Sequence, residues 1–328
     1  MTGQIVTVFG GSGFLGRYVV RRLVKQGCRV RVAVRRPNEA LFLKPYGDVG
    51  QVAIVQANVR DHVSTRAAIR GASAVVNCVG EMFPSGKQTH SAVQRDGAER
   101  IARIAAEEGV ARLVHISALG ANADSDSTYY RSKAEGELAI AAAFPKAVIM
   151  RPSVLFGTED SFFNRFGGLS QILPILPLIG AETKFQPVYV DDVAAAVSAT
   201  VADGAKAGVY ELGGPEVATL RQLIERLLRV IQRRRLLVAL PFWLARINAW
   251  FFDAGQFVTG GLVMNRLLTK DQVRLLRYDN VVSKGAKGLA EFGIEPTAID
   301  SVLEGYLIRF RPHGQFDAIT ASAKNLRS

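Results

Sequence analysis

Apolar residues in the first half of the chain follow two periodicities, one typical of buried strands and one typical of helices. Short β-branched runs, such as residues 4–9 and 28–34, have the length of buried strands. Between them, over 13–26, apolar residues recur three and four positions apart, as on one face of a helix. This repeated order predicts a parallel sheet with helices on both faces. The predicted strands are 4–9, 28–34, 51–56, 73–78, 111–117 and 146–151, and the predicted helices are 13–26, 62–70, 90–108 and 129–143.

The regular alternation ends near Arg151. A stretch rich in glycine, proline and aliphatic residues, 166–180, is predicted to be a loop, and a further strand is predicted at 208–212. We therefore expect an α/β protein with a doubly wound parallel sheet, the Rossmann arrangement, and a smaller, mostly helical C-terminal domain. The expected boundaries are 1–155 for the first domain, with 187–214 returning to it, and 156–186 and 215–328 for the second.

Glycines spaced three apart follow the first predicted strand directly. Gly10, Gly13 and Gly16 separate this strand from the first helix. Such a turn presents backbone N–H groups at a helix N-terminus, where the helix dipole favours a phosphate. Gly10 suits the turn, Gly13 lets a pyrophosphate approach the backbone, and Gly16 lets helix and strand pack closely. The pattern predicts a dinucleotide site, to which Ser12, Phe14 and Leu15 also contribute.

Arginines stand at the end of the second predicted strand, where an NAD site usually carries Asp or Glu. A carboxylate there would repel a 2′-phosphate, whereas the guanidinium groups of Arg35 and Arg36 would bind it. Arg17, just after the last glycine, is expected to reach the same phosphate. A solvated basic strand end is the alternative interpretation. The pattern favours NADP(H) over NAD(H).

Composition limits the class of protein further. With 328 residues, 48% of them hydrophobic, the chain is long enough for a doubly wound domain and an appended smaller one. The net charge of +12 favours acidic partners such as dinucleotides or anionic lipid, and no nucleic-acid-binding motif is present. The four histidines lack metal-ligand spacing, so no metal site is predicted. The two cysteines lie in or beside apolar strands, which is typical of a protein in a reducing compartment. The first predicted strand starts close to Met1, so we expect a cytoplasmic bacterial protein or an already mature sequence.

A tyrosine and a lysine stand four residues apart at the start of a predicted helix. Tyr129 and Lys133 therefore project from one face, where the ammonium can lower the phenol pKa and hold the cofactor ribose. The phenolate could then act as a general acid or base beside the nicotinamide. Ser117 is the hydroxyl available at the end of the preceding strand. A shift of one residue decides whether it faces the nicotinamide or the core.

Several motifs together resemble the extended and atypical short-chain dehydrogenase/reductase family. They are the glycine turn, Tyr129-x-x-x-Lys133, and the stretches 58–61, 151–157 and 188–193. Members of that family typically carry Asp at the position of Asn58, whose carbonyl oxygen can still accept a hydrogen bond from the adenine amino group. The resemblance implies further cofactor contacts from Asn58, Val59, Val79, Gly80, Pro152 and Ser153.

The C-terminal third resembles one branch of this family more closely. Residues 240–245, 251–253 and 268–276 are similar to the alpha subcomplex subunit 9 family, an accessory subunit of respiratory complex I. That resemblance implies a tightly held NADPH that does not turn over. It also implies complex I partners where the peripheral and membrane arms join, near the quinone site. The expected location is peripheral, on the cytoplasmic side of a bacterial inner membrane or on the matrix side of a mitochondrial one.

The same region has features that favour docking to a membrane complex. Residues 221–235 combine an apolar helical stripe with five arginines on its other faces, and 236–252 are apolar and contain Trp243 and Trp250. This second stretch is too short and interrupted to span a bilayer, but suits a helix lying at an anionic lipid surface. The alternative is an ordinary helical substrate lid. The competing function is an NADP-dependent reductase, epimerase or dehydratase acting on a small hydroxy- or keto-substrate.

Overall fold

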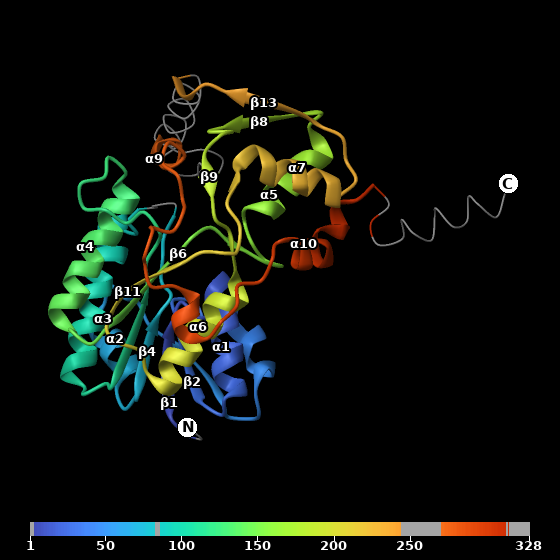
Figure 1. Cartoon of the computed structure of the whole chain (residues 1–328). Coiled ribbons are helices and arrows are strands. Elements are labelled where there is room, and N and C mark those ends of the chain that lie inside the picture. Colours follow the sequence, from blue (N-terminus) through green and yellow to red (C-terminus); the bar gives the residue numbers. More distant parts are fainter. Residues whose placement is uncertain (1–2, 83–85, 244–269, 313, 315–328) are drawn as a thin grey trace.

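The computed structural model describes residues 3–82, 86–243, 270–312 and 314 (Figure 1). Its centre is a seven-stranded sheet with the order β11-β6-β5-β4-β1-β2-β3. Every neighbouring pair in this sheet is parallel. The prediction of a doubly wound parallel sheet is therefore confirmed. The strands are β1 (Ile5–Phe9), β2 (Arg29–Val34), β3 (Val52–Gln56), β4 (Ala74–Asn77), β5 (Arg112–Ile116), β6 (Val148–Pro152) and β11 (Gly208–Leu212).

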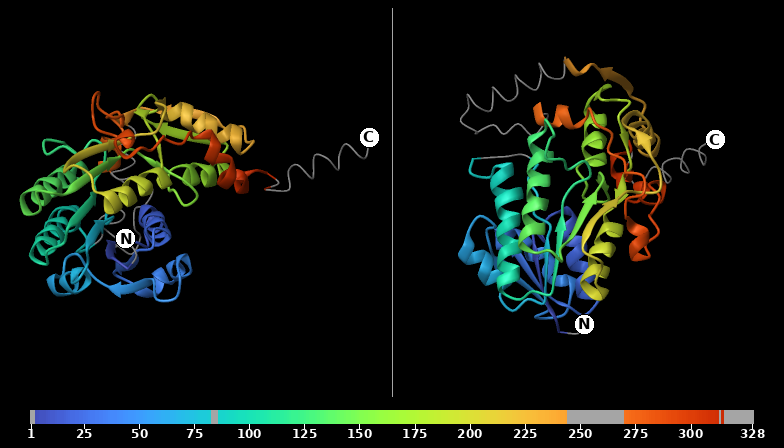
Figure 2. Two further views of the ribbon diagram at one scale, coloured as in Figure 1. Left: turned by 60° about the horizontal axis from the view of Figure 1, so that its bottom comes forward. Right: turned by 60° about the vertical axis from the view of Figure 1, so that its left-hand side comes forward.

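Helices cover both faces of the sheet (Figure 2). One face packs against α1 (Phe14–Lys25) and α6 (Val190–Asp203), which contact each other. The other face packs against α2 (His62–Ile69), α3 (Asp96–Glu107) and α4 (Thr128–Ala143). Because apolar side chains on both faces of the strands are buried, the strands read as nearly continuous apolar runs in the sequence.

Two elements of this domain differ from the sequence-based expectation. The helix predicted over 90–108 is divided into a π-helical turn, η2 (Ser91–Arg95), and α3. At this turn the Gln94 carbonyl oxygen approaches α4 so closely that a Cβ atom on Gly136 would lie 2.2 Å from it. A 3-10 helix that the sequence analysis did not predict, η1 (Pro37–Tyr46), follows β2.

A smaller part of the chain lies over the carboxyl ends of the sheet strands (Figure 1). Its core includes Phe163, Leu223, Leu227 and Leu303. The helices are α5 (Phe163–Ile172), α7 (Leu220–Val230), α9 (Lys270–Leu275) and α10 (Asp300–Leu307), with the 3-10 turn η4 (Ile308–Phe310). Another 3-10 turn, η3 (Leu289–Phe292), packs against α6 and β11 of the sheet domain. Short two-stranded sheets pair β7 (Leu155–Phe156) with β10 (Val188–Tyr189), β9 (Lys184–Phe185) with β12 (Ala218–Thr219), and β8 (Ile175–Ile179) with β13 (Leu236–Leu240). The division into two domains at the expected boundaries stays a prediction.

The loop predicted over 166–180 is wrong. This stretch forms the end of α5 and the strand β8. Leu176 and Leu178 are fully buried and alternate with the exposed Ile175 and Pro177. The alternation was hidden because every residue of this strand is apolar.

The helix predicted over 221–235, and the first part of the one predicted over 236–252, also need correction. Helix α7 ends at Val230, and Gln232 has a positive φ of 54°, which breaks the helical path. The arginines at 233–235 therefore lie beyond the helix, and β13 pairs in parallel with β8 instead of forming a surface helix. Residues 244–252 of the predicted surface helix, which include Trp250, lie outside the described residues. Among the described helices, none is both long and apolar enough to cross a membrane.

Candidate dinucleotide-binding site

The glycine turn lies where the strand order of the sheet reverses, between β1 and β4. Ligands of doubly wound sheets bind in the crevice at this point. Gly10 has a φ of 72°, which a residue with a side chain rarely adopts. A Cβ atom on Gly16 would lie 2.2 Å from the Gly10 carbonyl oxygen and 2.7 Å from the Gly11 Cα. The turn and the start of α1 therefore pack at a distance that only glycine permits at position 16.

The N-terminus of α1 is suited to an anion. Gly13 is its N-cap, and no side chain caps the first turn, which also contains no acidic residue. The Gly13 N–H donates to the Gly10 carbonyl oxygen at 3.0 Å, which closes the turn. Because the first N–H groups of a helix lack partners within the helix, a pyrophosphate fits their donors and the helix dipole.

A buried pair of polar side chains, Asn77 and His115, orders the end of β4, the strand next to β1. The Asn77 side-chain nitrogen lies 3.1 Å from His115 Nδ1, and its oxygen accepts the Val79 N–H at 3.0 Å. Burial lowers the pKa of His115 well below its usual value, so the ring is neutral at pH 7. This pair orders the turn that carries Val79 and Gly80 beside Gly10. The role of this pair was not predicted from the sequence, although two polar residues at the ends of otherwise apolar strands were a signal for it.

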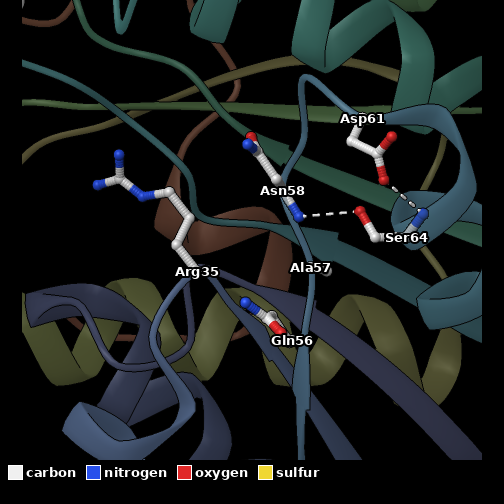
Figure 3. Close-up of a pocket in the computed structure, with 6 residues that line it drawn as sticks. All are labelled: Arg35, Gln56, Ala57, Asn58, Asp61 and Ser64. Carbon is white, nitrogen blue, oxygen red and sulfur yellow. Dashed lines mark hydrogen bonds between the residues drawn. The ribbon is translucent and has the colours of Figure 1, made fainter.

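A pocket of about 330 Å³ lies at the carboxyl ends of β2 and β3 (Figure 3). The exposed Arg35 enters it from β2, and the loop after β3 lines its other side. The Asp61 carboxylate is turned toward Ser64, whose N–H it accepts at 2.8 Å, and hydrogen bonds from Ser64 lower the pKa of Asp61. The lining residues are Arg35, Gln56, Ala57, Asn58, Asp61 and Ser64.

The other two candidate phosphate-binding arginines have protein partners. Arg36 is paired with Glu39 at 2.9 Å. Arg17 is paired with Glu159 at 3.2 Å, and its guanidinium lies 5.0 Å from the ring centre of Phe42. Of the three, Arg35 is thus the one that lines the pocket.

Asn58 shapes the loop at the predicted adenine end. Its side-chain oxygen accepts the Arg60 N–H at 3.1 Å, and its own N–H donates to Ser64 Oγ at 3.2 Å. Val59 is buried against Gly97 of α3, where a Cβ atom would lie 2.9 Å from it. Because a carbonyl oxygen has two lone pairs, Asn58 keeps one acceptor position for a base.

Tyr129 and Lys133 lie in the first turns of α4, as predicted. Lys133 is 2% exposed, and its Nζ donates to the Ile116 carbonyl oxygen at 3.0 Å. Burial lowers the pKa of Lys133 to about 8. Burial also raises the pKa of Tyr129, whose ring packs edge-on to His90 at 5.8 Å. No hydrogen bond joins Tyr129 to Lys133 in the described part of the chain, and the expected lowering of the phenol pKa by the ammonium is absent there.

Ser117 directly follows β5 and is 4% exposed. Among the residues that the structure describes, its Oγ has no hydrogen-bond partner. An unsatisfied buried hydroxyl costs about 1–3 kcal/mol, so a bound polar group beside it would be favourable. This orphaned hydroxyl and the uncapped α1 turn fit a nicotinamide dinucleotide.

The last two predicted cofactor positions follow the end of β6. The Pro152 carbonyl oxygen accepts the Leu119 N–H at 3.0 Å. Ser153 is 5% exposed, and its Oγ donates to Asn280 Oδ1 at 2.6 Å. The structure therefore uses the Ser153 hydroxyl to hold a C-terminal segment against this end of the sheet.

Comparison with known proteins identifies relatives over the whole chain. Residues 10–164 match a family described as NAD(P)H-binding. The chain is 36% identical to NADH dehydrogenase [ubiquinone] 1 alpha subcomplex subunit 9, mitochondrial, of Arabidopsis thaliana, over 99% of this chain and 82% of that protein. It is 31% identical to the mitochondrial 40 kDa subunit of NADH-ubiquinone oxidoreductase of Neurospora crassa, over 99% of this chain and 84% of that protein.

A solved structure with a similar fold is the NADPH-dependent quinone oxidoreductase of Escherichia coli in complex with NADPH. It has a TM-score of 0.69 and 18% sequence identity, and the match covers 92% of this chain and 98% of that one. At this identity the likeness concerns the fold alone.

Proposed function

The chain belongs to the alpha subcomplex subunit 9 family of NADH:ubiquinone oxidoreductase, and we propose that it is an accessory subunit of respiratory complex I that holds NADPH without turnover. The observation that carries the proposal is the extent of the match, which covers 99% of this chain and so includes the smaller part as well as the nucleotide-binding fold. The bound nucleotide stabilises the subunit, and the subunit stabilises the junction of the peripheral and membrane arms near the quinone site.

NADPH is the proposed nucleotide because of Arg35. Its guanidinium lines the pocket at the ends of β2 and β3, where a 2′-phosphate would lie. The one carboxylate among the lining residues, that of Asp61, already accepts the Ser64 N–H. Gly10, Gly13 and Gly16 would hold the pyrophosphate. Tyr129, Lys133 and Ser117 would lie at the nicotinamide end, where the bound group supplies a hydride donor.

Replacing Arg35 by aspartate should weaken NADPH binding about 100-fold and leave NADH binding within a few-fold of its original strength. A charged hydrogen bond contributes about 1.5–3 kcal/mol, and the new carboxylate would repel the 2′-phosphate. Fluorescence titration with each nucleotide measures the two affinities. Arg29→Asp, an exposed position at the other end of the same strand, is the matched control. Equal NADPH affinity in the two variants would contradict the NADP(H) assignment.

The absence of turnover is proposed from the state of two candidate catalytic side chains, those of Lys133 and Tyr129. Lys133 donates to the Ile116 carbonyl oxygen, and burial raises the pKa of Tyr129. A phenol with a raised pKa is a poor general base at neutral pH. These residues suit a binding site for the nicotinamide end better than a proton relay.

Docking is proposed through an apolar face formed by β8, β13 and the end of α5. Leu236 and Ile175 are neighbours in this parallel pair and are 62% and 48% exposed. Ile172, at the end of α5 before β8, and Trp243, three residues after β13, are also exposed, by 81% and 63%. An exposed apolar face of this kind is typical of interaction sites. We propose that it contacts complex I subunits of the membrane arm.

An anionic lipid surface is the second proposed partner of the same region. Arg234 is exposed two residues before the start of β13, and Arg229 is exposed near the end of α7. Each basic residue close to anionic lipid contributes about 1 kcal/mol. The proposed location is peripheral, on the cytoplasmic side of a bacterial inner membrane or the matrix side of a mitochondrial one.

Native electrophoresis of gently solubilised membranes tests the subunit role. The chain, detected with an antibody, should migrate with NADH:ubiquinone oxidoreductase activity. Migration as a free protein in membranes that contain active complex I would overturn the proposal.

A second candidate function is an NADP-dependent reductase, epimerase or dehydratase. The spacing of Tyr129 and Lys133 on α4 favours it, because this pair retains the residue types of an active family member. Substrate-dependent oxidation of bound NADPH by the purified chain would support this alternative.

A further inference from the structure

The N-terminus of α4 is capped by a residue far away in the sequence. Asp271, in α9, accepts three hydrogen bonds there. Its Oδ2 accepts from Ser127 Oγ at 2.9 Å and from the Tyr129 N–H at 3.1 Å, and its Oδ1 accepts the Thr128 N–H at 2.9 Å. Helices α9 and α4 are thus joined by a carboxylate that holds two backbone N–H groups and one hydroxyl.

This carboxylate supplies a charge that α4 itself lacks. The first turn of α4 contains no acidic residue, and the hydroxyl of its own N-cap, Ser127, accepts the Tyr130 N–H at a long distance of 3.4 Å. A negative charge at a helix N-terminus is stabilised by the helix dipole and by the unpaired N–H groups. Asp271 is 19% exposed at the side chain, so solvent screens the interaction only in part.

Further contacts hold α9 on this end of α4. The Arg274 guanidinium donates to the Asp126 carbonyl oxygen at 3.2 Å, and Tyr278 Oη donates to the Asp126 carboxylate at 3.3 Å. On the inner side of α9, Val273 is 1% exposed. The loop before α4 is therefore held by Arg274 of α9 and by Tyr278, which follows α9, in addition to Asp271.

The same stretch of chain also reaches the second predicted cofactor segment. Asn280 is 8% exposed, and its Oδ1 accepts from Ser153 Oγ at 2.6 Å and from the Val154 N–H at 3.2 Å. Its Nδ2 donates to the Leu119 carbonyl oxygen at 3.3 Å. Residues 271–280 therefore contact the start of α4 at one end and the end of β6 at the other.

We propose that residues 271–280 form a coupling segment, and that Asp271 in it is a positioning residue that sets the orientation of α4. Through Asp271, the contact of α9 with the start of α4 is linked to occupancy of the dinucleotide site. The inference rests on the proposed NADPH site. Tyr129, whose N–H Asp271 holds, and Lys133, one turn later, lie where the nicotinamide end would bind. Linkage between two sites is reciprocal. The free energy by which bound NADPH stabilises the contact of the coupling segment with α4 therefore equals the free energy by which that contact strengthens NADPH binding.

The test compares the full-length wild-type chain with Asp271→Asn. An asparagine offers one oxygen, and its NH₂ group would face a donor N–H, so at least one of the hydrogen bonds is lost together with the charge. We expect NADPH to dissociate about five- to tenfold faster, a typical size for coupling between sites. Loss of NADPH fluorescence after a chase with excess NADP⁺ gives the rate. Glu304→Gln, the same charge change at an exposed residue of α10, is the matched control and should leave the rate unchanged.

Amide hydrogen exchange distinguishes coupling from a purely structural role of Asp271. A purely structural role would leave the NADPH-dependent protection of residues 271–280 unchanged. In the wild-type chain, added NADPH should slow amide exchange in residues 271–280, and in Asp271→Asn this protection should be reduced. Arg274→Ala changes a side chain that is 46% exposed, so this variant should fold normally. It should also release NADPH faster and show less NADPH-dependent protection, each by a smaller amount than Asp271→Asn.

An Asp271→Asn chain with a lowered melting temperature but unchanged NADPH dissociation and unchanged NADPH-dependent protection would overturn the inference. Failure of the proposed function itself is distinguishable, because then the wild-type chain would not retain NADPH in the same chase.

Discussion

Replacement of Gly16 by alanine is expected to weaken dinucleotide binding severely. The added Cβ atom would lie 2.2 Å from the Gly10 carbonyl oxygen and 2.7 Å from the Gly11 Cα. Both of these are backbone atoms, so no flexible side chain can move aside, and the turn itself must open. An opened turn separates the N–H groups of the α1 N-terminus from the position of the pyrophosphate.

We expect NADPH affinity to fall by about 100-fold or more and the free energy of unfolding to fall by about 1–3 kcal/mol, as for overpacked interiors. Fluorescence titration and thermal melting measure these two changes. Gly168→Ala is the matched control, because a Cβ atom there, within α5, meets no atom within 4 Å. Since alanine is favoured over glycine inside a helix by about 0.5–1 kcal/mol, this control should bind NADPH normally and melt no earlier. Normal NADPH binding by Gly16→Ala would contradict the assignment of the turn.

Introducing two carboxylates on the apolar face of β8 and β13 is expected to release the chain from complex I. In the double variant Ile175→Asp and Leu236→Asp, neighbouring positions on paired strands become charged. Because both side chains are about half exposed, the fold should persist. Burial of two unpaired carboxylates in an interface costs several kcal/mol, which exceeds what a local apolar contact contributes.

Native electrophoresis followed by immunodetection measures the release. The matched control is the double variant Val49→Asp and Leu138→Asp, because both residues are exposed in the sheet domain and neither lines the pocket that contains Arg35. The control should remain in the complex. If the face variant stays bound as firmly as the control, β8 and β13 do not form the docking surface. NADPH binding should be normal in both variants, since neither changes a residue of the proposed nucleotide site.

The central sheet and the glycine turn could be predicted from the sequence because their signals are local. Each buried parallel strand is a short apolar run, and Gly10, Gly13 and Gly16 stand directly between a strand and a helix. The backbone approach at Gly16 gives the physical reason why this spacing is informative.

The paired strands β8 and β13 could not be predicted in the same way. Leu236 pairs with Ile175 across a long stretch of chain, so neither strand carries a local sign of its partner. Pro177 within β8 also argued against a strand, although a proline is tolerated where its missing N–H is not needed.

The contact of Asp271 with the N-terminus of α4 could not be predicted from the sequence either. Asp271 is 142 residues away from Tyr129, whose N–H it accepts, and an acidic residue at the start of α9 reads as a cap of that helix alone. The partners of Arg17 were missed for a related reason, since Glu159 and Phe42 approach it only in the folded chain.

The most direct measurement of the central claim is the state of the nucleotide in purified native complex I. Nucleotide is extracted and identified before and after the complex has oxidised NADH with quinone. If the chain is an accessory subunit with a non-catalytic site, it is present in the complex together with an equal amount of NADPH, which is unoxidised after turnover. A chain that purifies apart from the complex, or bound NADPH that is consumed during turnover, would contradict this account.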